Sequence, residues 1–468
     1  MSGIDHKPLE NIRLPVPLAW KSLAGARGDV TAVSTHALYL GGSFRGDENL
    51  PGLTIEVEAG PGQIISLTGL LVATGRGEGV FHPDLQSSAD ALRDLLGLIR
   101  KDQHIGICAG TDVEASDRFT GFSDYQFVPR ALPEMNFDET DTRCTFLGRI
   151  FQAPILITGM TGGVSRGEMI NHRLARAAAA FGIPMGIGSQ RIALENPDHT
   201  NVFDVKKSAP DIFLIGNIGA AQLSTGDAAG LCRRAVDMVG ADALAIHLNV
   251  MQECIQVEGD QNFRGLLDSI ADVCAALPVP VMIKEVGCGI DLRTALLLQQ
   301  AGVAAIDTGG RGGTSWTRIE GLRSSSAGTA GLGETFRDWG IPTAYNLIAL
   351  RRELPGMPLV ATGGLRDGQM VAKARALGAD MAGIGLPLLR AALSSEEDVH
   401  TLLSNLIRGL KITMIGTGSR QLRDLEQHIA RGMPLAPVAP PDHPITHPGS
   451  QPGLNLSRTV RKGTGRGP

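Results

Sequence analysis

The sequence has no long apolar segment and no excess of charge. No uninterrupted apolar stretch reaches about 18 residues, the length that a membrane-spanning helix needs, and residues 1–6 carry no apolar signal core. The formal net charge is only −5, and acidic and basic residues are interspersed. Nucleic-acid binding usually needs a basic face. We therefore expect a cytoplasmic protein that binds neither membranes nor nucleic acids.

Cysteine is also scarce. The chain has 6 cysteines with no CxxC pair and no zinc-like spacing, namely Cys108, Cys144, Cys232, Cys254, Cys274 and Cys288. This set is typical of reduced thiols rather than of a disulfide framework or a structural zinc site. Glycine, in contrast, accounts for 60 of 468 residues. Because no collagen-like period is present, the excess indicates tight turns and close approach of the backbone to a ligand.

Eight short apolar runs recur in the middle of the chain, each followed by a glycine or polar cluster and then a helix-like stretch. The runs are residues 155–157, 185–187, 212–215, 243–246, 281–283, 304–306, 359–361 and 381–384. This alternation predicts parallel, doubly buried strands joined by helices. Eight units over about 230 residues match a (β/α)8 TIM barrel, whose active site lies where the strands end. We predict this α/β fold.

The segments between and around the runs complete the predicted organisation. Helical spacing indicates helices at residues 171–181, 222–239, 292–301 and 369–377, whereas residues 316–343 form an unusually long loop. Residues 1–97 have no assigned role; strands at 53–58 and 63–67, a turn at 60–62 and a helix at 89–98 suggest a small α+β module or a poorly ordered appendage. Residues 98–433 contain the barrel, and residues 434–468 are expected to form a disordered tail.

A polar or glycine-rich cluster follows each predicted strand. The eight clusters are residues 159–163, 188–191, 216–219, 247–253, 284–287, 307–316, 363–368 and 385–387. Exposed N–H groups at the last two clusters favour an anion, and barrels often bind phosphate there. The alternative is that Gly363 and Gly364 form only a turn. We favour phosphate binding.

Three groups of side chains could carry chemistry. Lys284 could offset negative charge on a cofactor ring or act as a Schiff-base nucleophile, or it could be a solvated strand end paired with Glu285. Glu253 offers a hard oxygen ligand for Mg²⁺, whereas residues 258–260 are expected to form a solvated turn. His247, Asn249 and Gln252 could alternatively be ordinary buried polar residues. The third group is basic and precedes the barrel, at Arg100, Lys101 and His104.

With these clusters assembled, residues 98 to about 430 resemble type II isopentenyl-diphosphate isomerases, the flavin-dependent form. The matching motifs are residues 100–104, 131–134, 160–163, 188–191, 216–219, 247–253, 284–287 and 312–316. The resemblance implies a TIM barrel that binds FMN in its reduced form and Mg²⁺, with NADPH as reductant. It also implies interconversion of isopentenyl and dimethylallyl diphosphate in isoprenoid biosynthesis, by protonation and deprotonation at the reduced flavin. The family commonly forms homo-oligomers, so we expect a tetramer or an octamer.

The resemblance also assigns roles to individual residues. It implies cofactor contacts from Gly159, Met160, Thr161, Ser189, Asn217, Lys284, Gly309, Thr314, Gly363, Gly364, Leu365, Arg366, Gly385 and Leu386. Substrate contacts are implied for Arg100, Lys101, Ser189, Gln190, Arg191, Asn249 and Gln252, a metal contact for Glu253, and catalytic positions for Gln252 and His247, which orient groups rather than titrate. Two departures stand out: the family often has serine at Gly309, which removes one expected FMN hydrogen bond, and alanine at Gly159 and Gly385.

Two other functions are compatible with such a barrel. An FMN-dependent 2-hydroxy-acid oxidase would place a histidine base at a strand end, but the region after the sixth strand offers Gly312, Gly313, Thr314 and Ser315 instead. A catalytically silent regulator that binds flavin or diphosphate would use residues 1–97 as its interaction module. Gln252, Glu253 and Lys284 argue against silence.

Overall fold

The computed structural model describes residues 12–22, 27–33, 38–42, 49–60, 63–75, 78–83, 86–160, 164–224, 226–324 and 326–432. Between residues 12 and 96 this description covers the backbone, together with the buried side chain of Val57. The expected tail at 434–468 and the expected flavin contact Thr161 lie outside the described residues.

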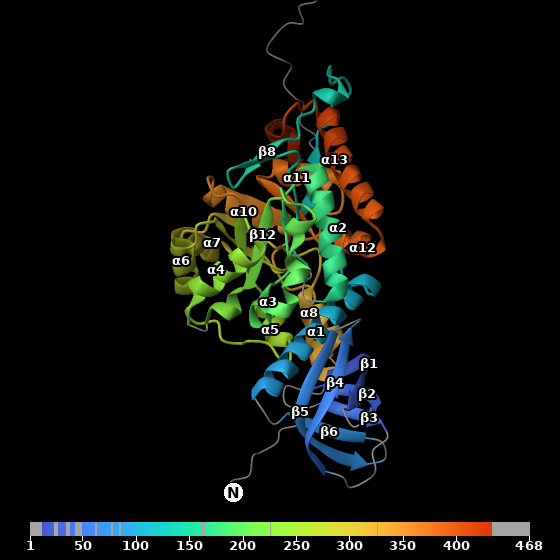
Figure 1. Ribbon diagram of the computed structural model, residues 1–468. Helices are drawn as coiled ribbons and strands as arrows, with labels where there is room; N and C mark the ends of the chain where they lie inside the picture. Colours follow the sequence, from blue (N-terminus) through green and yellow to red (C-terminus); the bar gives the residue numbers. More distant parts are fainter. Residues whose placement is uncertain are drawn as a thin grey trace, which may run out of the picture.

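The main body is the predicted TIM barrel (Figure 1). Its eight parallel strands follow the chain order and close where β10 pairs with β17. They are β10 (Ile155–Ile157), β11 (Met185–Gly186), β12 (Leu214–Gly219), β13 (Ala243–Leu248), β14 (Val281–Glu285), β15 (Ala305–Asp307), β16 (Leu359–Thr362) and β17 (Met381–Ile384). Every apolar run predicted as a strand overlaps one of them. The fold prediction is confirmed.

Alternate residues of each strand face opposite sides of the barrel wall. Leu156, Ala245 and Met282 belong to a small inner cluster of buried side chains, whereas their chain neighbours pack outward against the helices. Phe146 and Phe151 join the inner cluster from the hairpin of β8 (Cys144–Phe146) and β9 (Arg149–Phe151). Because both faces of each strand are buried, the strands are apolar without alternation, as the sequence indicated.

Helices surround the barrel, and further short elements lie in the loops. The helices are α2 (Ser165–Phe181), α3 (Arg191–Glu195), α4 (Ala228–Val239), α5 (Val250–Ile255), α6 (Leu266–Ala276), α7 (Leu292–Gln300), α8 (Trp316–Arg323), α9 (Ala327–Thr335), α10 (Thr343–Glu353), α11 (Gly368–Ala376), α12 (Leu386–Ser394) and α13 (Glu396–Thr417). The 3-10 helices are η1 (Phe122–Asp124), η2 (Phe137–Glu139), η3 (Pro197–Phe203), η4 (Val205–Lys207), η5 (Ala220–Ser224) and η6 (Leu422–His428). Strands β7 (Tyr125–Phe127) and β18 (Ile429–Arg431) pair with each other.

Two predictions about these segments need correction. The helix expected at 222–239 is broken, because Asp227 accepts from the Gly230 N–H and starts α4 there. The long loop expected at 316–343 instead contains α8 and α9, each with a serine N-cap, at Ser315 and Ser326. The two helices pack closely through small residues such as Gly321 and Gly333. Because such a contact needs no stripe of large apolar side chains, the sequence did not show the usual pattern of an amphipathic helix.

The N-terminal region is a second, smaller closed barrel of six antiparallel strands. Its strand order is β1 (Ile12–Ser22), β2 (Arg27–Val33), β3 (Leu38–Gly42), β6 (Glu78–Pro83), β5 (Gln63–Gly75) and β4 (Asn49–Gly60). The two predicted strands lie within β4 and β5, which form an antiparallel hairpin; residues 61 and 62 of the predicted turn lie outside the described residues. A closed barrel leaves no unpaired sheet edge.

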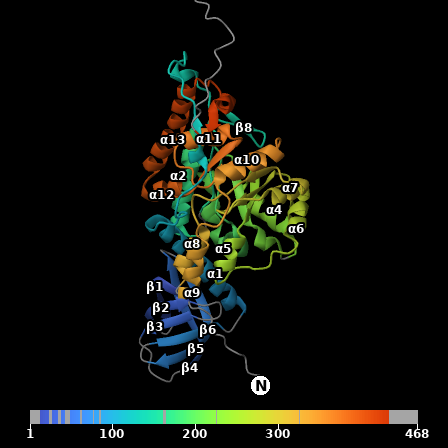
Figure 2. The same cartoon turned by 180° about the vertical axis from the view of Figure 1, so that it is seen from behind.

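One continuous helix connects the two barrels. α1 (Gln86–Gly110) lies against β4, β5 and β6 at its beginning and against α8, α3 and α12 of the TIM barrel further on. The predicted helix at 89–98 is its first half, and the expected domain boundary at residue 97 falls inside it. Figures 1 and 2 show α1, α5 and α8 together at the end of the TIM barrel that faces the smaller barrel.

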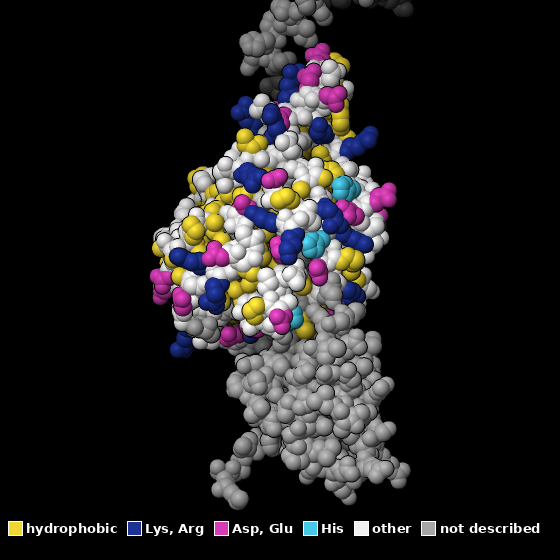
Figure 3. Space-filling model, viewed as in Figure 1, with side chains coloured by type: hydrophobic (Ala, Val, Ile, Leu, Met, Phe, Trp, Pro, Cys, Tyr) yellow, Lys and Arg dark blue, Asp and Glu magenta, His cyan; other side chains and the backbone are white. Residues whose placement is uncertain are grey.

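The surface and the thiols add two observations. On the face in Figure 3, lysine and arginine side chains are interspersed with acidic ones over the described residues. Across the described part of the chain, no helix combines the length and apolar character needed to cross a bilayer. All six cysteines lie in that part and none forms a disulfide, and burial raises the pKa of Cys108, Cys144 and Cys232 to about 12, so these thiols stay protonated.

Candidate active site

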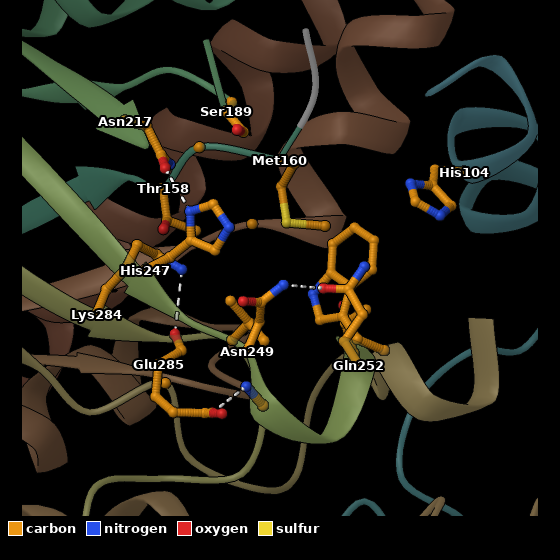
Figure 4. A pocket seen from close by; sticks show the side chains of 18 of the residues that line it. His104, Thr158, Met160, Ser189, Asn217, His247, Asn249, Gln252, Lys284 and Glu285 are labelled. Atoms are coloured by element: carbon orange, nitrogen blue, oxygen red, sulfur yellow. Dashed lines mark hydrogen bonds between the residues drawn. The ribbon is translucent and has the colours of Figure 1, made fainter. Parts of the chain in front are cut away.

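A cavity of about 860 Å³ opens at the C-terminal ends of the barrel strands. At or just beyond the ends of seven of the eight strands, the inward-facing residue lines it, because strand alternation continues the inner cluster by two residues. This layer consists of Thr158, Gly188, Asn217, His247, Lys284, Thr362 and Gly383. Figure 4 shows Asn217, His247 and Lys284 on one side of the cavity and Gln252 and His104 on the other. A volume in the range of about 300–1,000 Å³ is usual for cofactor and ligand sites.

His247 has one defined tautomer. Its Nδ1 lies 2.8 Å from Oδ1 of Asn217, whose Nδ2 in turn donates to the Ile187 carbonyl at 2.9 Å. Since that amide nitrogen is used as a donor, its oxygen must accept, and Nδ1 of His247 therefore carries the proton. Burial, with Lys284 and Lys101 nearby, lowers the pKa of His247 to about 3. The imidazole is neutral at pH 7 and its Nε2 is an acceptor.

The neutral state of His247 makes the protein sensitive to acid. Its folded pKa of about 3 lies below the ordinary value of 6.5, so the unfolded chain takes up a proton that the folded chain does not. The contribution of His247 to the free energy of unfolding is fully present above pH 6.5. It falls as the pH drops, by at most about 2 kcal/mol between pH 6.5 and 5. Urea unfolding at pH 7 and pH 5 should show this loss. His247→Asn should unfold with a smaller difference between the two pH values; an equal difference would contradict the assignment.

Lys284 is a buried strand-end lysine, not a solvated one. It is 7% exposed, and its Nζ donates to the Glu285 backbone carbonyl at 3.1 Å. The strand register places it between His247 and the fully buried Asp307. Burial raises the pKa of Asp307, and Lys284 opposes that shift. The alternative of a Lys284–Glu285 ion pair is wrong, because the Glu285 carboxylate instead accepts from the backbone N–H groups of residues 287–289.

Helix α5 and its N-cap residue Asn249 present three polar side chains to the cavity. Asn249 Nδ2 donates to Oε1 of Gln252 at 3.2 Å and to Oε1 of Glu253 at 2.8 Å. The second Glu253 oxygen accepts from the Asp260 N–H at 2.9 Å. These bonds fix the carboxylate while leaving lone pairs for a cation. Within the described residues, no group of three or more His, Cys, Asp or Glu side chains is arranged to hold a metal, so a Mg²⁺ ion here would need ligands from a bound phosphate and water.

Glu320 is the functional residue that sequence reasoning missed. It lies on α8, is 1% exposed, and its Oε1 is 2.9 Å from Nε2 of His104 and accepts from Nε2 of Gln252 at 2.8 Å. Its Oε2 accepts from Nε of Arg323 at 2.8 Å. His104, Arg323 and these hydrogen bonds lower the pKa of Glu320 despite its burial. Glu320 belongs to no recognised motif and lies in a segment that we expected to be a loop, so nothing in the sequence pointed to its role.

The wall of the cavity that α1 and α3 form is cationic. Arg100, Lys101 and His104 line it from α1, and Arg191 lines it from the start of α3. Burial, followed by the charges of Arg100 and Arg191, lowers the pKa of Lys101 to about 7. Trp316 meets the His104 ring edge to face, with centroids 5.3 Å apart. Burial, together with repulsion between the positive charges, disfavours the charged form of Lys101. A multivalent anion would relieve this repulsion, so the group is suited to bind one.

A second candidate anion site lies where α12 begins. α12 begins at Leu386 with Gly385 as its N-cap, and no side chain caps this terminus. Its free N–H groups and the helix dipole favour a phosphate. Gly363 adopts φ +121°, and a Cβ there would meet the Gly310 carbonyl at 2.0 Å. This turn can therefore be made only by glycine, and it brings backbone rather than side chains to the cavity.

The backbone conformation explains why residue 309 is glycine. Its φ is +48°, and an added Cβ would meet the Glu285 carbonyl at 2.0 Å, so this backbone does not accommodate the serine that the resemblance led us to expect. Gly159 and Gly385 also line the cavity; an added Cβ would meet the Ile187 carbonyl at 1.9 Å and Met160 Sδ at 2.9 Å, respectively.

The structure brings most of the predicted site residues to this one cavity. All of the predicted residues line it except Thr161, which is not described, and Gln190. Gln190 is fully buried, and its amide binds the Ala235 carbonyl and the Asn217 N–H. Arg366 lines the cavity, but its guanidinium braces the loops by donating to the Gly312 carbonyl at 3.0 Å and by pairing with Glu114.

Glu258 does not belong to a solvated turn. Its side chain lines the cavity, is 15% exposed and lies 2.5 Å from Nη2 of Arg323. The expectation failed because charged residues in a turn are usually exposed, whereas here Arg323 from α8 compensates a buried carboxylate.

The residues present fit a flavin mononucleotide. The uncapped start of α12 and the glycine turn at residues 363–364 can take its phosphate, and the layer with Asn217, His247 and Lys284 offers hydrogen-bond partners to a polar ring. Lys284 is placed to offset negative charge on that ring.

Comparisons with known proteins agree with this geometry. The sequence profile of the FMN-dependent dehydrogenase family matches residues 102–201 and 230–431. The isopentenyl-diphosphate delta-isomerase of Nostoc sp. is 47% identical over 327 residues, which are 70% of this chain and 93% of that protein. The protein of the same name from Stutzerimonas stutzeri is 46% identical over 329 residues, 70% of this chain and 95% of its own. Among solved structures, a lactate oxidase of Pediococcus acidilactici is 17% identical, with a TM-score of 0.49 over 67% of this chain and 85% of that one; a likeness this distant carries no argument.

Proposed function

Because this chain belongs to the isopentenyl-diphosphate delta-isomerase family, of the FMN-dependent type II, we propose that it interconverts isopentenyl and dimethylallyl diphosphate with bound FMN and Mg²⁺. The observation that carries the proposal is a single cavity lined by the cationic residues of α1, by the uncapped start of α12 and by the half-buried amide of Gln252. One anion site suits the cofactor phosphate and the other suits the substrate diphosphate.

The cofactor end is formed by backbone and by the strand layer. The residues that would hold FMN are Gly159, Met160, Ser189, Asn217, Lys284, Gly309, Thr314, Gly363, Gly364, Leu365, Arg366, Gly385 and Leu386. When bound in reduced form, FMN would supply an electron-rich ring and the acid–base group for moving a proton on an alkene. Lys284 would balance the negative charge of that ring, and neutral His247 would accept a hydrogen bond at Nε2. NADPH remains our proposed reductant.

The substrate end combines cations with a metal. Arg100, Lys101 and Arg191, with the Ser189 hydroxyl, would bind the diphosphate oxygens, because guanidinium and ammonium groups pair strongly with phosphate. Glu253, whose carboxylate accepts a hydrogen bond from Asn249, would hold Mg²⁺, which would supply positive charge to the diphosphate. These contacts fix one end of a small substrate and thereby orient its alkene.

The reacting part of the site must exclude water and hold the alkene in a fixed orientation. Protonation of an unactivated alkene creates a carbocation-like centre that water would quench. Met160 and Trp316 line the cavity, and their apolar side chains would help to exclude water. Glu320 and Asn249 hold the Gln252 amide in one orientation. An amide is a poor acid, so Gln252 orients the alkene rather than transferring a proton. The isomerisation involves no net redox change.

An oxidase of the 2-hydroxy-acid type is the main alternative. Such an enzyme needs a strand-end histidine that can gain a proton during the reaction. The strand-end histidine in this cavity is His247, whose pKa is lowered to about 3 by burial and by two lysines, so protonating it would be costly. This environment favours the isomerase over the oxidase.

One assay separates the isomerase, an oxidase and a silent regulator. The purified chain is loaded with FMN, reduced with dithionite and given isopentenyl diphosphate and Mg²⁺ in deuterated water. An isomerase forms dimethylallyl diphosphate and incorporates deuterium. Absence of both in the reduced enzyme, with FMN bound, would refute the proposal, whereas flavin reduction by 2-hydroxy acids would support the oxidase.

Replacing Glu253 tests the metal site. Glu253→Gln keeps the shape but removes the charge, and we expect kcat/KM to fall about 10- to 100-fold with a higher Mg²⁺ requirement, because Mg²⁺ prefers carboxylate oxygens. The measurement is turnover across a Mg²⁺ titration. Unchanged activity at every Mg²⁺ concentration would remove the metal role of Glu253.

Lys101 makes diphosphate binding depend on pH. Its pKa of about 7 means that it is charged below pH 7 and loses its charge as the pH rises, so affinity for inorganic diphosphate should weaken above pH 7 by up to about tenfold per pH unit. Lys101→Arg should flatten this dependence, since arginine stays charged. Calorimetric titration of both proteins with inorganic diphosphate from pH 6 to 9 measures this dependence. The ratio of the two Kd values is compared at each pH, so that ionisation of the ligand cancels. Parallel profiles would contradict it.

A further inference from the structure

Gln256 is a buried amide that lies beside Arg100. It follows the last residue of α5, and its backbone N–H donates to the Gln252 carbonyl at 2.9 Å. The residue is 4% exposed and its side chain lines the cavity. A buried amide must satisfy both its oxygen and its nitrogen, because an unpaired polar group away from water is costly.

Only one orientation of this amide satisfies both of its neighbours. Arg100 has only donors and the Glu320 carboxylate has only acceptors, so the amide oxygen faces Arg100 and the nitrogen faces Glu320. In this orientation the oxygen accepts from Nη1 of Arg100 at 2.9 Å, and the nitrogen donates to Oε1 of Glu320 at 3.3 Å. The same Glu320 oxygen accepts from Nε2 of Gln252 at 2.8 Å. A continuous chain of hydrogen bonds therefore joins Arg100 to Gln252.

The turn after Gln256 supports the same connection. The Gly259 N–H donates to the Gln256 carbonyl at 3.0 Å, which closes the turn. Glu258, within it, places Oε1 3.9 Å from Nη1 of Arg100. Burial lowers the pKa of Arg100, and the Glu258 charge opposes that shift. The arginine on α1 is thus held by an amide and a carboxylate from the segment that also carries Gln252.

We propose that Gln256 is a positioning residue that couples the diphosphate-binding arginine to the amide beside the reacting carbons. The inference rests on the proposed function, which makes Arg100 a phosphate ligand and Gln252 a neighbour of the alkene. Through this chain, interactions with the non-reacting diphosphate help to orient the reacting end, which is how remote binding energy raises kcat rather than affinity alone.

A binding cycle tests the first half of the connection. The FMN-loaded full chain is titrated with inorganic diphosphate and Mg²⁺ by calorimetry, as wild type, Arg100→Ala, Gln256→Leu and the double variant. We expect Gln256→Leu to weaken binding about tenfold in the wild type and less than about twofold in Arg100→Ala, since the hydrogen bond to a charged partner is already lost there. A tenfold loss in both backgrounds would overturn the proposal.

This readout is independent of turnover. A wild-type protein that binds diphosphate with the expected cycle but fails to isomerise would refute the proposed function and leave the Arg100–Gln256 coupling intact. The matched control is Gln103→Leu, on the same helix as Arg100. Gln103 is 8% exposed, and its Oε1 has no hydrogen-bond partner among the described residues. Losses as large in this control as in Gln256→Leu would count against a specific role.

Gln256→Glu tests the second half, and it also serves if the leucine variant does not fold. The new carboxylate still accepts from Arg100 but no longer donates to Glu320. We expect KM to stay within about threefold and kcat to fall at least about tenfold, because the Gln252 amide loses its fixed orientation. A fall in kcat at nearly unchanged KM would support the coupling. Equal effects on kcat and KM, or none on kcat, would overturn it.

Discussion

Replacement of Glu320 by alanine is expected to lower kcat about 100- to 1,000-fold. Glu320 fixes both the Gln252 amide and His104 through a single oxygen. A displacement of about 1 Å at the reacting carbons is enough for a loss of this size. Steady-state kinetics with saturating isopentenyl diphosphate and reduced FMN give the measurement.

The same substitution should also destabilise the protein. Arg323 is 9% exposed and pairs with Glu320, so removal of the carboxylate leaves a buried charge without one of its two partners, at a cost of about 3–5 kcal/mol. Glu320→Gln, which retains volume and one acceptor, separates misfolding from catalysis. Glu334→Gln is the matched control on α9, because that carboxylate is 51% exposed and surface pairs contribute at most about 1 kcal/mol. A kcat within threefold of wild type in folded Glu320→Gln would contradict the assigned role.

Gly363→Ala is expected to abolish FMN retention. At φ +121°, an alanine is strained, and its Cβ would lie 2.0 Å from the Gly310 carbonyl. The turn must move, and the phosphate then loses backbone N–H groups whose positions a side chain cannot replace. We expect the Kd for FMN to rise at least about 100-fold, from strain of about 1–3 kcal/mol together with the lost hydrogen bonds. Fluorescence titration of the apoprotein with FMN measures it.

The control for this prediction is Gly356→Ala. Nothing lies within 4 Å of a Cβ added at Gly356, and its φ does not fall in the left-handed region. This variant should bind FMN as the wild type does. If both variants bind FMN equally well, the turn at residues 363–364 is not a phosphate site.

Much of the fold could be predicted because barrel strands have a local signature. Each strand is a short apolar run, since both of its faces are buried, and the eight runs come in the order in which the strands pair. The N-terminal barrel was harder to predict. The hairpin of β4 and β5 was recognised from alternation and a turn, but β1, β2, β3 and β6 gave no such signal, and closure depends on pairings far apart in the chain.

The site could be predicted to the extent that its residues follow strands. His247 and Lys284 were identified because the ends of parallel strands meet at one rim. Glu320 escaped because it acts from a helix that resembled a loop, and its importance arises from partners 216 and 68 residues away. Gln190 was assigned to the substrate by its motif, whereas the structure turns its amide into the barrel wall.

The sequence by itself determined the class of fold, the rim on which the chemistry lies and the kinds of group available there. These features depend on short stretches of the chain, because a strand buried on both faces is a continuous apolar run and its end is marked by glycine or polar residues. Only the tertiary structure decided which of those groups are charged and how they are oriented. The pKa of His247 and of Lys101 and the orientation of the Gln252 and Gln256 amides depend on neighbours contributed by α1, α8 and adjacent strands. Electrostatic and hydrogen-bond energies depend on distance in space, and distance in the chain does not give it.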